Sequence, residues 1–162
     1  MLILANKDTP TMNITILAIG KCKNTAIGSL CAHYIKRLSW TLTVVEVVPK
    51  KEAPTPNIRQ KHEADLLLKH IKTGDYVIAL DSSGQQTTSA KLATTLEELS
   101  TSHGACTWVI GGADGLDTTI FARAQHCISL GQNTWPHMLV RVMLVEQIYR
   151  AHQILARHPY HH

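Results

Sequence analysis

The amino-acid sequence predicts an α/β fold in which a parallel sheet is covered by helices on both faces. Short apolar segments rich in β-branched residues alternate with segments of helical periodicity along the chain. The apolar segments are nearly continuous, which is typical of strands that are buried on both faces of a sheet.

The first half of the chain supplies two strands and two helices. The first strand is expected at residues 12–20, an apolar run that ends in glycine. A helix is expected at 27–38, because its apolar residues recur at the spacing of one helix face. Residues 41–48 are β-branched and apolar and predict the second strand. Three prolines and two lysines indicate an exposed loop at 49–56, and a helix follows at 58–71.

The second half of the chain continues the alternation. Strands are expected at 76–81, 105–110 and 126–130, and helices at 118–124 and from Pro136 to about Leu155. Between the first two of these strands, Ser89 is the expected cap of a helix that carries Leu92, Leu96 and Leu99 on one face. Residues 81–84 are expected to form a turn, and Asn133 or Thr134 to cap the last helix.

The size and composition of the chain indicate one soluble globular domain. Its 162 residues are 44% hydrophobic and 17% charged. Residues 12–162 are expected to form this domain, and 1–11 to be a disordered extension. No apolar run approaches the roughly 20 residues of a membrane helix, and residues 1–20 lack the layout of a secretory signal. We therefore expect a cytoplasmic protein without a membrane partner.

The net charge and the spacing of the cysteines limit the functions that the chain can have. The net charge of +4 permits an RNA partner, and this modest excess suits a substrate that is already a large, shaped assembly. The four cysteines form no C-x-x-C pair, which argues against a zinc knuckle or a thioredoxin-type site. They are expected to be small buried hydrophobic residues.

Three strand ends carry unusual residues and point to a ligand site. They read Leu80-Asp81, Ile110-Gly111-Gly112 and Leu130-Gly131, and ligands of parallel sheets gather at the carboxyl ends of strands. Glycines at 111, 112 and 115 let the backbone approach a ligand, although a turn that requires glycine is an alternative explanation. The segment is not G-x-G-x-x-G, which argues against a nicotinamide-dependent oxidoreductase.

The polar loop from Leu130 to His137 is the second candidate element. Its backbone donors and acceptors could hold the edge of a flat heterocycle, and an ordinary entry into a helix is the alternative. In the helix that follows, Glu146 and Arg150 are four residues apart and could form an ion pair. The functional alternative is that Arg141 or Arg150 holds a phosphate. The helix is apolar on several sides, which favours burial by more than one neighbour, such as a second subunit.

The C-terminal tail combines rings and bases. Tyrosine and histidine side chains, as in His158-Pro159-Tyr160-His161-His162, can stack on an unpaired base and transfer protons. A metal site made of the three tail histidines is the alternative, but no carboxylate or cysteine cluster accompanies them.

The order of these C-terminal motifs resembles the RlmH family of SPOUT-class RNA methyltransferases. The resemblance rests on Ile110-Gly111-Gly112-x-x-Gly115-Leu116, Ser129-Leu130, Thr134-x-Pro136-His137-x-Leu139-x-Arg141-Val142, Glu146-Gln147-x-Tyr149-Arg150-Ala151 and His158-Pro159-Tyr160-His161, and it covers 12–162. It implies a parallel α/β sheet with a C-terminal deep trefoil knot, an exception to unknotted topology. It also implies a homodimer that methylates N3 of a pseudouridine in 23S rRNA of the assembled ribosome.

The resemblance further implies a cofactor and residue roles. The cofactor is S-adenosylmethionine, and its implied contacts are Leu80, Gly111, Leu130, Gly131, Gln132, Asn133, Thr134 and Trp135. The chain departs from the family at Gln132 and Asn133, where relatives often carry apolar or basic residues, and at His162, where many carry arginine or lysine. Residues 1–11 have no counterpart in the family.

Methyl transfer from a sulfonium requires alignment of donor and acceptor and removal of the N3 proton. We expect Tyr160 to contact the base, His161 to act as general base, and Arg150 and His137 to orient the RNA or the loop. RNA contacts are expected from Arg141, Arg150, His158 and His162, and no metal ion is expected. The alternative function is a non-catalytic SPOUT-fold RNA-binding or ribosome-assembly factor.

Overall fold

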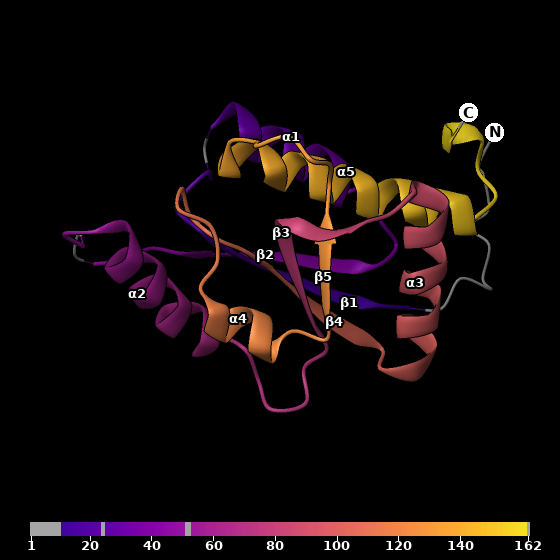
Figure 1. Cartoon of the computed structure of the whole chain (residues 1–162). Helices are drawn as coiled ribbons and strands as arrows, with labels where there is room; N and C mark the ends of the chain where they lie inside the picture. The colour runs from indigo at the N-terminus through magenta and orange to yellow at the C-terminus, as the bar shows by residue number, and fades with distance from the viewer. Residues whose placement is uncertain (1–10, 24, 51–52, 162) are drawn as a thin grey trace.

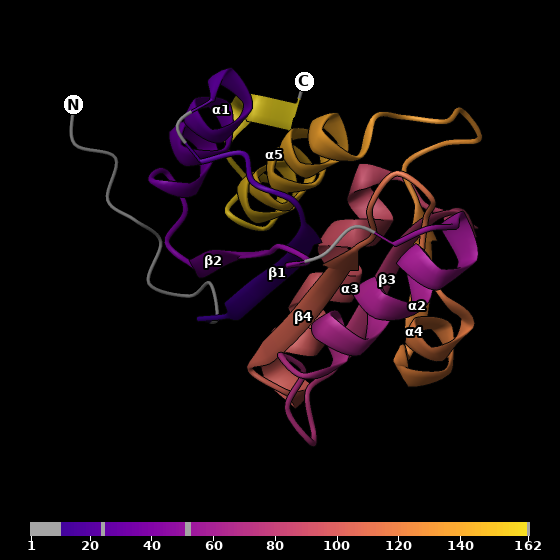
Figure 2. The same ribbon diagram turned by 90° about the vertical axis from the view of Figure 1, so that its left-hand side faces the viewer.

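The computed structural model describes residues 11–23, 25–50 and 53–161, and it forms three layers (Figure 1). The expected extension therefore falls almost entirely on residues outside this part of the chain, as does His162. One face of a central sheet is covered by α1 (Ala26–Ile35), α3 (Ser89–Ser102) and α5 (His137–Leu155). The other face is covered by α2 (Pro56–Leu68) and α4 (Thr118–Arg123), as Figure 2 also shows. The predicted α/β fold with helices on both faces is confirmed.

The sheet has five strands in the order β2-β1-β4-β3-β5, and every pairing is parallel. Their bounds are Asn13–Ile19 for β1, Thr41–Val47 for β2, Val77–Gln86 for β3, Ala105–Ile110 for β4 and His126–Ser129 for β5. All five predicted strands are present. Because the strands are parallel, the carboxyl ends of β3, β4 and β5 meet at one edge of the sheet.

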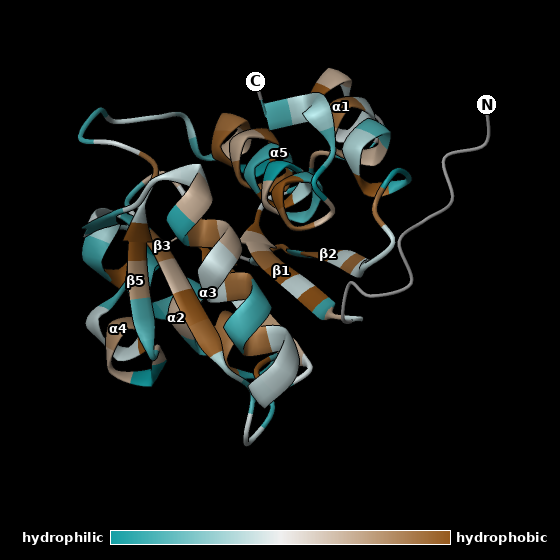
Figure 3. Cartoon of the chain, turned by 90° about the vertical axis from the view of Figure 1, so that its right-hand side faces the viewer, coloured by the Kyte–Doolittle hydropathy of each residue, from teal (hydrophilic) through white to brown (hydrophobic). Residues whose placement is uncertain are grey.

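Two apolar cores lie on the two faces of the sheet. Ile14, Ile16 and Trp108 belong to the core shared with α1, α3 and α5. Leu17 and Val109, their neighbours in the sequence, belong to the core shared with α2 and α4. This alternation follows from the two-residue period of a strand, and in Figure 3 brown, hydrophobic segments recur along β1, β3 and β5. In the described part of the chain, no helix combines the length and apolarity that a membrane crossing requires.

The cysteines agree with the sequence prediction for three positions. Cys22, Cys31 and Cys106 are buried, whereas Cys127 is half-buried. Burial raises the pKa of the Cys106 thiol to about 12 and that of Cys31 to about 11. These thiols are therefore protonated at neutral pH and behave as small hydrophobic side chains.

The third strand is longer than predicted, and the turn expected at residues 81–84 is wrong. β3 continues to Gln86 through an irregularity, with a register shift between Leu80 and Gln85, which both pair with Ile128. A Cβ at Gly84 would lie 2.7–2.8 Å from backbone atoms of Cys127 and Ile128. Glycine at this position lets the irregular strand remain beside β5.

Two of the expected helix caps are also wrong. Thr88 caps α3 by accepting a hydrogen bond from the backbone N–H of Lys91, while the hydroxyl of Ser89 donates to Gln147 of α5 at 2.7 Å. Pro136 occupies the N-cap position of α5, and no side chain caps this helix. The loop residues Asn133 and Thr134 instead line a cavity.

Arg141 has a structural role, and the prediction that it binds RNA is corrected. Its side chain is 1% exposed and donates hydrogen bonds to the carbonyl oxygens of Ile19 and Gly20. Its Nη1 also lies 3.5 Å from Oε1 of Glu46 in β2. A guanidinium enclosed in this way does not reach an RNA phosphate. It fixes α5 to the carboxyl ends of β1 and β2.

We predict that Arg141→Ala lowers the free energy of unfolding by about 3–5 kcal/mol, because it leaves buried acceptors without their charged donor. Urea denaturation followed by circular dichroism measures this change. Lys36→Ala, at an exposed position after α1, is the control and should change stability by less than about 0.5 kcal/mol. Equal stability of the two variants would contradict the structural role of Arg141.

Candidate functional site

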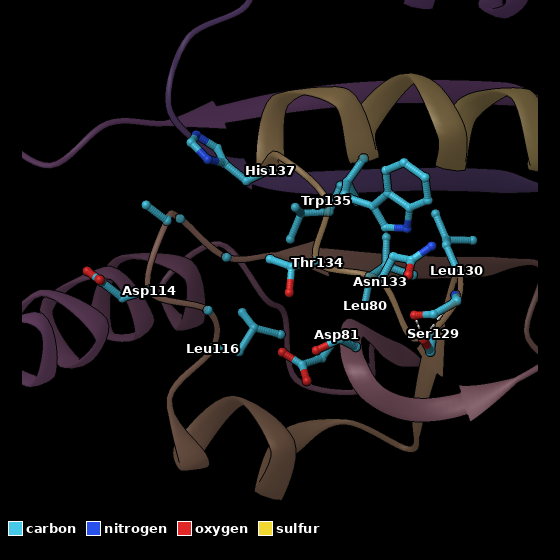
Figure 4. A pocket seen from close by; sticks show the side chains of 18 residues that line it. Leu80, Asp81, Asp114, Leu116, Ser129, Leu130, Asn133, Thr134, Trp135 and His137 are labelled. Carbon is cyan, nitrogen blue, oxygen red and sulfur yellow. Dashed lines mark hydrogen bonds between the residues drawn. The ribbon is translucent and has the colours of Figure 1, made fainter.

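A pocket of about 310 Å³ lies at the carboxyl ends of β4 and β5, beside the point where the regular part of β3 ends at Leu80 (Figure 4). Three segments form its walls: the middle of β3, where the strand becomes irregular after Leu80, the loop between β4 and α4, and the loop between β5 and α5. The lining residues are Leu80, Asp81, Ser82, Ile110, Gly111, Gly112, Ala113, Asp114, Gly115, Leu116, Ser129, Leu130, Gly131, Asn133, Thr134, Trp135, His137 and Val140. The three unusual strand ends of the sequence thus meet in one cavity.

Most residues predicted to contact the cofactor lie in this lining. Seven of them do so: Leu80, Gly111, Leu130, Gly131, Asn133, Thr134 and Trp135. Gln132 belongs to the same loop, but it is exposed and is not among the lining residues. His137, predicted as an orienting residue, lies at the start of α5 and also lines the pocket.

Residues 111–115, which we call the glycine segment, fold back on themselves at the pocket wall. The N–H of Gly115 donates to the carbonyl of Gly112 at 3.2 Å, and Gly115 has a φ of 84°, a conformation that favours glycine. A Cβ on Gly111 would lie 2.7 Å from the carbonyl oxygen of Gly115. The tight turn therefore requires glycine, and the same turn exposes backbone to the cavity.

Two carboxylates of the pocket were missed as site residues. Oδ1 of Asp81 accepts hydrogen bonds from the N–H of Ser83 at 2.9 Å and from its hydroxyl at 2.6 Å. Asp114, on the glycine segment, forms an ion pair with Arg59 of α2. Figure 4 shows Asp81 and Leu116 pointing toward one another within the pocket. Asp81 stood at one of the noted strand ends, so a signal for it was present in the sequence.

Trp135 and His137 contribute an aromatic ring and an imidazole to the pocket. Trp135 presents a large side chain that is 39% exposed at this loop. The pKa of His137 is lowered, first by burial and then by the charge of Arg141. His137 is therefore held in its neutral form at neutral pH.

The C-terminal tail is fixed to the middle of α5 by an ion pair and ring contacts. Oε1 of Glu146 accepts hydrogen bonds from Arg150 Nη2 at 2.7 Å and from the Tyr160 hydroxyl at 3.1 Å. The Arg150 guanidinium lies 4.9 Å from the Tyr160 ring centroid, and the rings of Tyr149 and Tyr160 are 4.8 Å apart. Burial, together with the neighbouring tyrosine and carboxylate, raises the pKa of Tyr160. The ion pair predicted between Glu146 and Arg150 is present.

Within one chain the predicted catalytic residues form two groups. His137 lies at the pocket, whereas Tyr160 contacts α5 at Glu146, nine residues or about 14 Å further along the helix. His158 is half-buried and accepts a hydrogen bond from the N–H of Tyr160 at 3.2 Å, and His161 is exposed. No described tail residue is among those that line the pocket. In the described residues no group of three or more histidine, cysteine, aspartate or glutamate side chains is arranged to hold a metal ion.

Comparison with known proteins places the chain in a family. A family model described as "Predicted SPOUT methyltransferase" matches residues 12–161. A protein of Rhodospirillum centenum named "Ribosomal RNA large subunit methyltransferase H" is 42% identical over 151 residues, which cover 93% of this chain and 99% of that protein. The chain belongs to the RlmH family of SPOUT methyltransferases. Another RlmH protein, from Clostridium botulinum, is 39% identical over 158 residues with the same coverage.

Solved structures show the same fold at low sequence identity. A probable methylase family protein from Haemophilus influenzae aligns over 90% of the chain and 69% of its own length, with a TM-score of 0.57 and 15% identity. TrmJ from Z. mobilis aligns over 86% of the chain and 70% of its own length, with a TM-score of 0.51. The chain therefore shares its α/β fold with both of these proteins.

The lowered pKa of His137 predicts that the unfolding free energies of the wild-type chain and its His137→Gln variant differ by an amount that depends on pH. Above about pH 7.5, His137 is neutral in the folded and unfolded states, and the difference in unfolding free energy is constant. As the pH falls below the unfolded pKa of about 6.5, the unfolded wild type takes up a proton that the folded state resists. The wild type should lose stability relative to the variant between pH 6.5 and 5.

Urea denaturation of both proteins at a series of pH values measures this difference. The pKa of the buried His152 is also lowered, but this residue is common to both proteins and cancels. A difference that stays constant from pH 8 to pH 5 would show that the folded protein does not resist protonation of His137.

Proposed function

We propose that this chain transfers a methyl group from S-adenosylmethionine to N3 of a pseudouridine in the 23S rRNA of the assembled ribosome, in the cytoplasm. One observation supports this most strongly: the loops that carry the family's C-terminal motifs close a single pocket at the carboxyl ends of three parallel strands. The relatives named ribosomal RNA large subunit methyltransferase H match almost the full chain.

The pocket fits the chemistry of S-adenosylmethionine. Its volume of about 310 Å³ lies at the lower end of the range for small-molecule sites, about 300–1,000 Å³. The side chains of Leu80, Ile110, Leu116, Leu130 and Val140 supply apolar walls for an adenine ring. The glycine segment admits close approach to the backbone, and the carboxylate of Asp81 favours a ligand that carries positive charge.

The cofactor supplies an electrophilic methyl group, and the chain must align the acceptor nitrogen with it. N3 loses its proton during transfer, so negative charge develops on the neighbouring carbonyl oxygens of the base. We assign proton removal to His161, contact with the base to Tyr160, and orientation to Arg150 and His137. His158 and His162 contact the RNA in this proposal, which no longer includes Arg141.

A homodimer would bring the predicted catalytic residues of the tail next to His137 at the pocket. The tail of one chain contacts α5 well away from the pocket of the same chain, so we infer that a second copy brings its tail to this pocket. Leu139 is 39% exposed, and Val142 and Met143 of α5 line a neighbouring hollow of about 470 Å³. This hollow shares Ser129, Leu130 and Gly131 with the pocket. An interface on α5 would cover these apolar residues.

We further propose that the chain has the knotted topology that membership of the family implies. Residues 12–162 act as one domain, and the C-terminal segment that contains the pocket loops is threaded as a deep trefoil knot. A knotted segment would hold the Leu130–Trp135 loop and the glycine segment in fixed relative positions, which favours a pre-formed cofactor site.

We predict that S-adenosylmethionine changes the fluorescence of Trp135, because this ring lines the pocket while Trp40 and Trp108 are buried in the core. Titration should give saturable binding in wild type, and calorimetry should give one site per chain. In Trp135→Phe the fluorescence change should be lost. Absence of binding by calorimetry would contradict the enzyme and favour a non-catalytic RNA-binding or assembly factor.

A second prediction concerns the tail. Truncation after Ala156 should abolish methylation of ribosomal RNA while leaving the affinity for S-adenosylmethionine within about twofold. Gly111→Ala should weaken the binding of S-adenosylmethionine while leaving the tail intact, because the added Cβ would collide with the Gly115 carbonyl. Co-expression of the two defective chains should restore activity, since one of the two shared sites is then complete. Activity that is not restored in isolated mixed dimers would contradict a site shared between subunits.

A further inference from the structure

A buried carboxylate on α2 lies directly behind the glycine segment and is not among the residues that line the pocket. Glu63 is 5% exposed, whereas its neighbours Lys61, His62 and Asp65 are exposed. Burying an ionisable side chain costs free energy unless other groups compensate it. The position of Glu63 therefore calls for a specific explanation.

The carboxylate of Glu63 lies against the backbone of Gly112. A Cβ on Gly112 would lie 2.6 Å from Oε2 and 2.7 Å from Oε1 of Glu63. The backbone N–H of Gly112 stabilises the carboxylate, while burial has the larger, opposite effect and raises the pKa of Glu63. Oε2 is buried and has no hydrogen-bond partner among the described residues. The contact thus joins one side chain to one peptide unit of the pocket wall.

This contact explains why residue 112 is glycine. Gly115 has a positive φ that favours glycine, but Gly112 does not. At Gly112 the constraint is the space that the Glu63 carboxylate occupies. A substitution at Gly112 is therefore expected to change the effect of a substitution at Glu63, and the reverse.

The same helix holds the glycine segment at a second point. One turn before Glu63, Arg59 forms its ion pair with Asp114, and the side-chain amide of Gln60 donates to the Asp114 carbonyl. The segment between these points, from Gly112 to Asp114, lines the pocket. A movement of Gly112 would therefore change the shape of the pocket wall.

We propose that Glu63 is a positioning residue for the cofactor site: its buried carboxyl group fixes Gly112 and so sets the shape of the glycine segment that faces the ligand. The inference rests on the proposed function, because it takes S-adenosylmethionine as the ligand. Glu63 acts through Gly112 and does not touch the cofactor.

The first test compares Glu63→Gln with Glu63→Leu in the full-length chain. Glutamine keeps an oxygen acceptor for the Gly112 N–H and should leave the Kd for S-adenosylmethionine within about twofold of wild type. Leucine removes the acceptor and should raise the Kd about tenfold, the effect of losing one hydrogen bond. Asp65→Leu, at an exposed position of the same helix, is the matched control and should bind as wild type does.

Calorimetry gives the Kd, and urea denaturation of the same samples separates binding from stability. If Glu63→Leu lowers stability but binds the cofactor with the wild-type Kd, Glu63 is only a core residue and the inference is wrong. If wild type itself does not bind the cofactor, the proposed function fails first. The two failures are therefore distinguishable.

A double-mutant cycle keeps the inference testable if Glu63→Leu does not fold. Gly112→Ala should raise the Kd, because its Cβ meets the carboxylate. Glu63→Asp shortens the side chain by one methylene and makes room for that Cβ. The double variant should therefore bind at least threefold more tightly than the product of the two single effects predicts. Additive effects would contradict a direct dependence between Glu63 and Gly112.

Discussion

The parallel direction of β3, β4 and β5 is the constraint on which the candidate site depends. Parallel pairing brings these strands to one edge of the sheet, so that the irregular part of β3 and two loops distant in sequence close a single cavity. The loops have little regular structure of their own. Their positions follow from the strands that precede them and from side chains of α2 and α5 that hold them.

Helix α5 connects the cavity with the C-terminal tail. Its first residue, His137, lines the cavity, and Arg141 one turn later is bonded to the ends of β1 and β2. Further along, Glu146 holds both Arg150 and Tyr160 and so fixes the tail. One rigid helix thus sets the spacing between the part of the molecule proposed to bind the cofactor and the part proposed to contact RNA.

Local sequence patterns were sufficient for the strands and for the location of the cavity. Apolar runs identified all five strands, and the unusual residues at three strand ends pointed to the edge of the sheet where the cavity lies. The individual cofactor contacts, seven of which line the cavity, came from the resemblance to the RlmH family and not from a local pattern. The parallel pairing converts these local signals into a site. The ion pair between Glu146 and Arg150 was equally accessible, because it depends only on a four-residue helical spacing.

The remaining features depend on contacts between distant segments, which no local pattern reveals. An arginine on an apolar helix suggested a phosphate ligand, but the carbonyl groups of Ile19 and Gly20 that enclose Arg141 lie about 120 residues earlier. β3 extends past the predicted turn because Gly84 fits against β5. No local pattern distinguishes Glu63 from the other charged residues of α2, and only the fold shows that it lies behind Gly112.

We propose that the cavity and the tail together methylate ribosomal RNA. Mass spectrometry of 23S rRNA from a strain that lacks this protein tests it most directly. We expect one pseudouridine to lose one methyl group in this strain, and a plasmid copy of the wild-type chain to restore it, whereas a copy truncated after Ala156 does not. An unchanged pattern of methylation in the deletion strain would contradict this function.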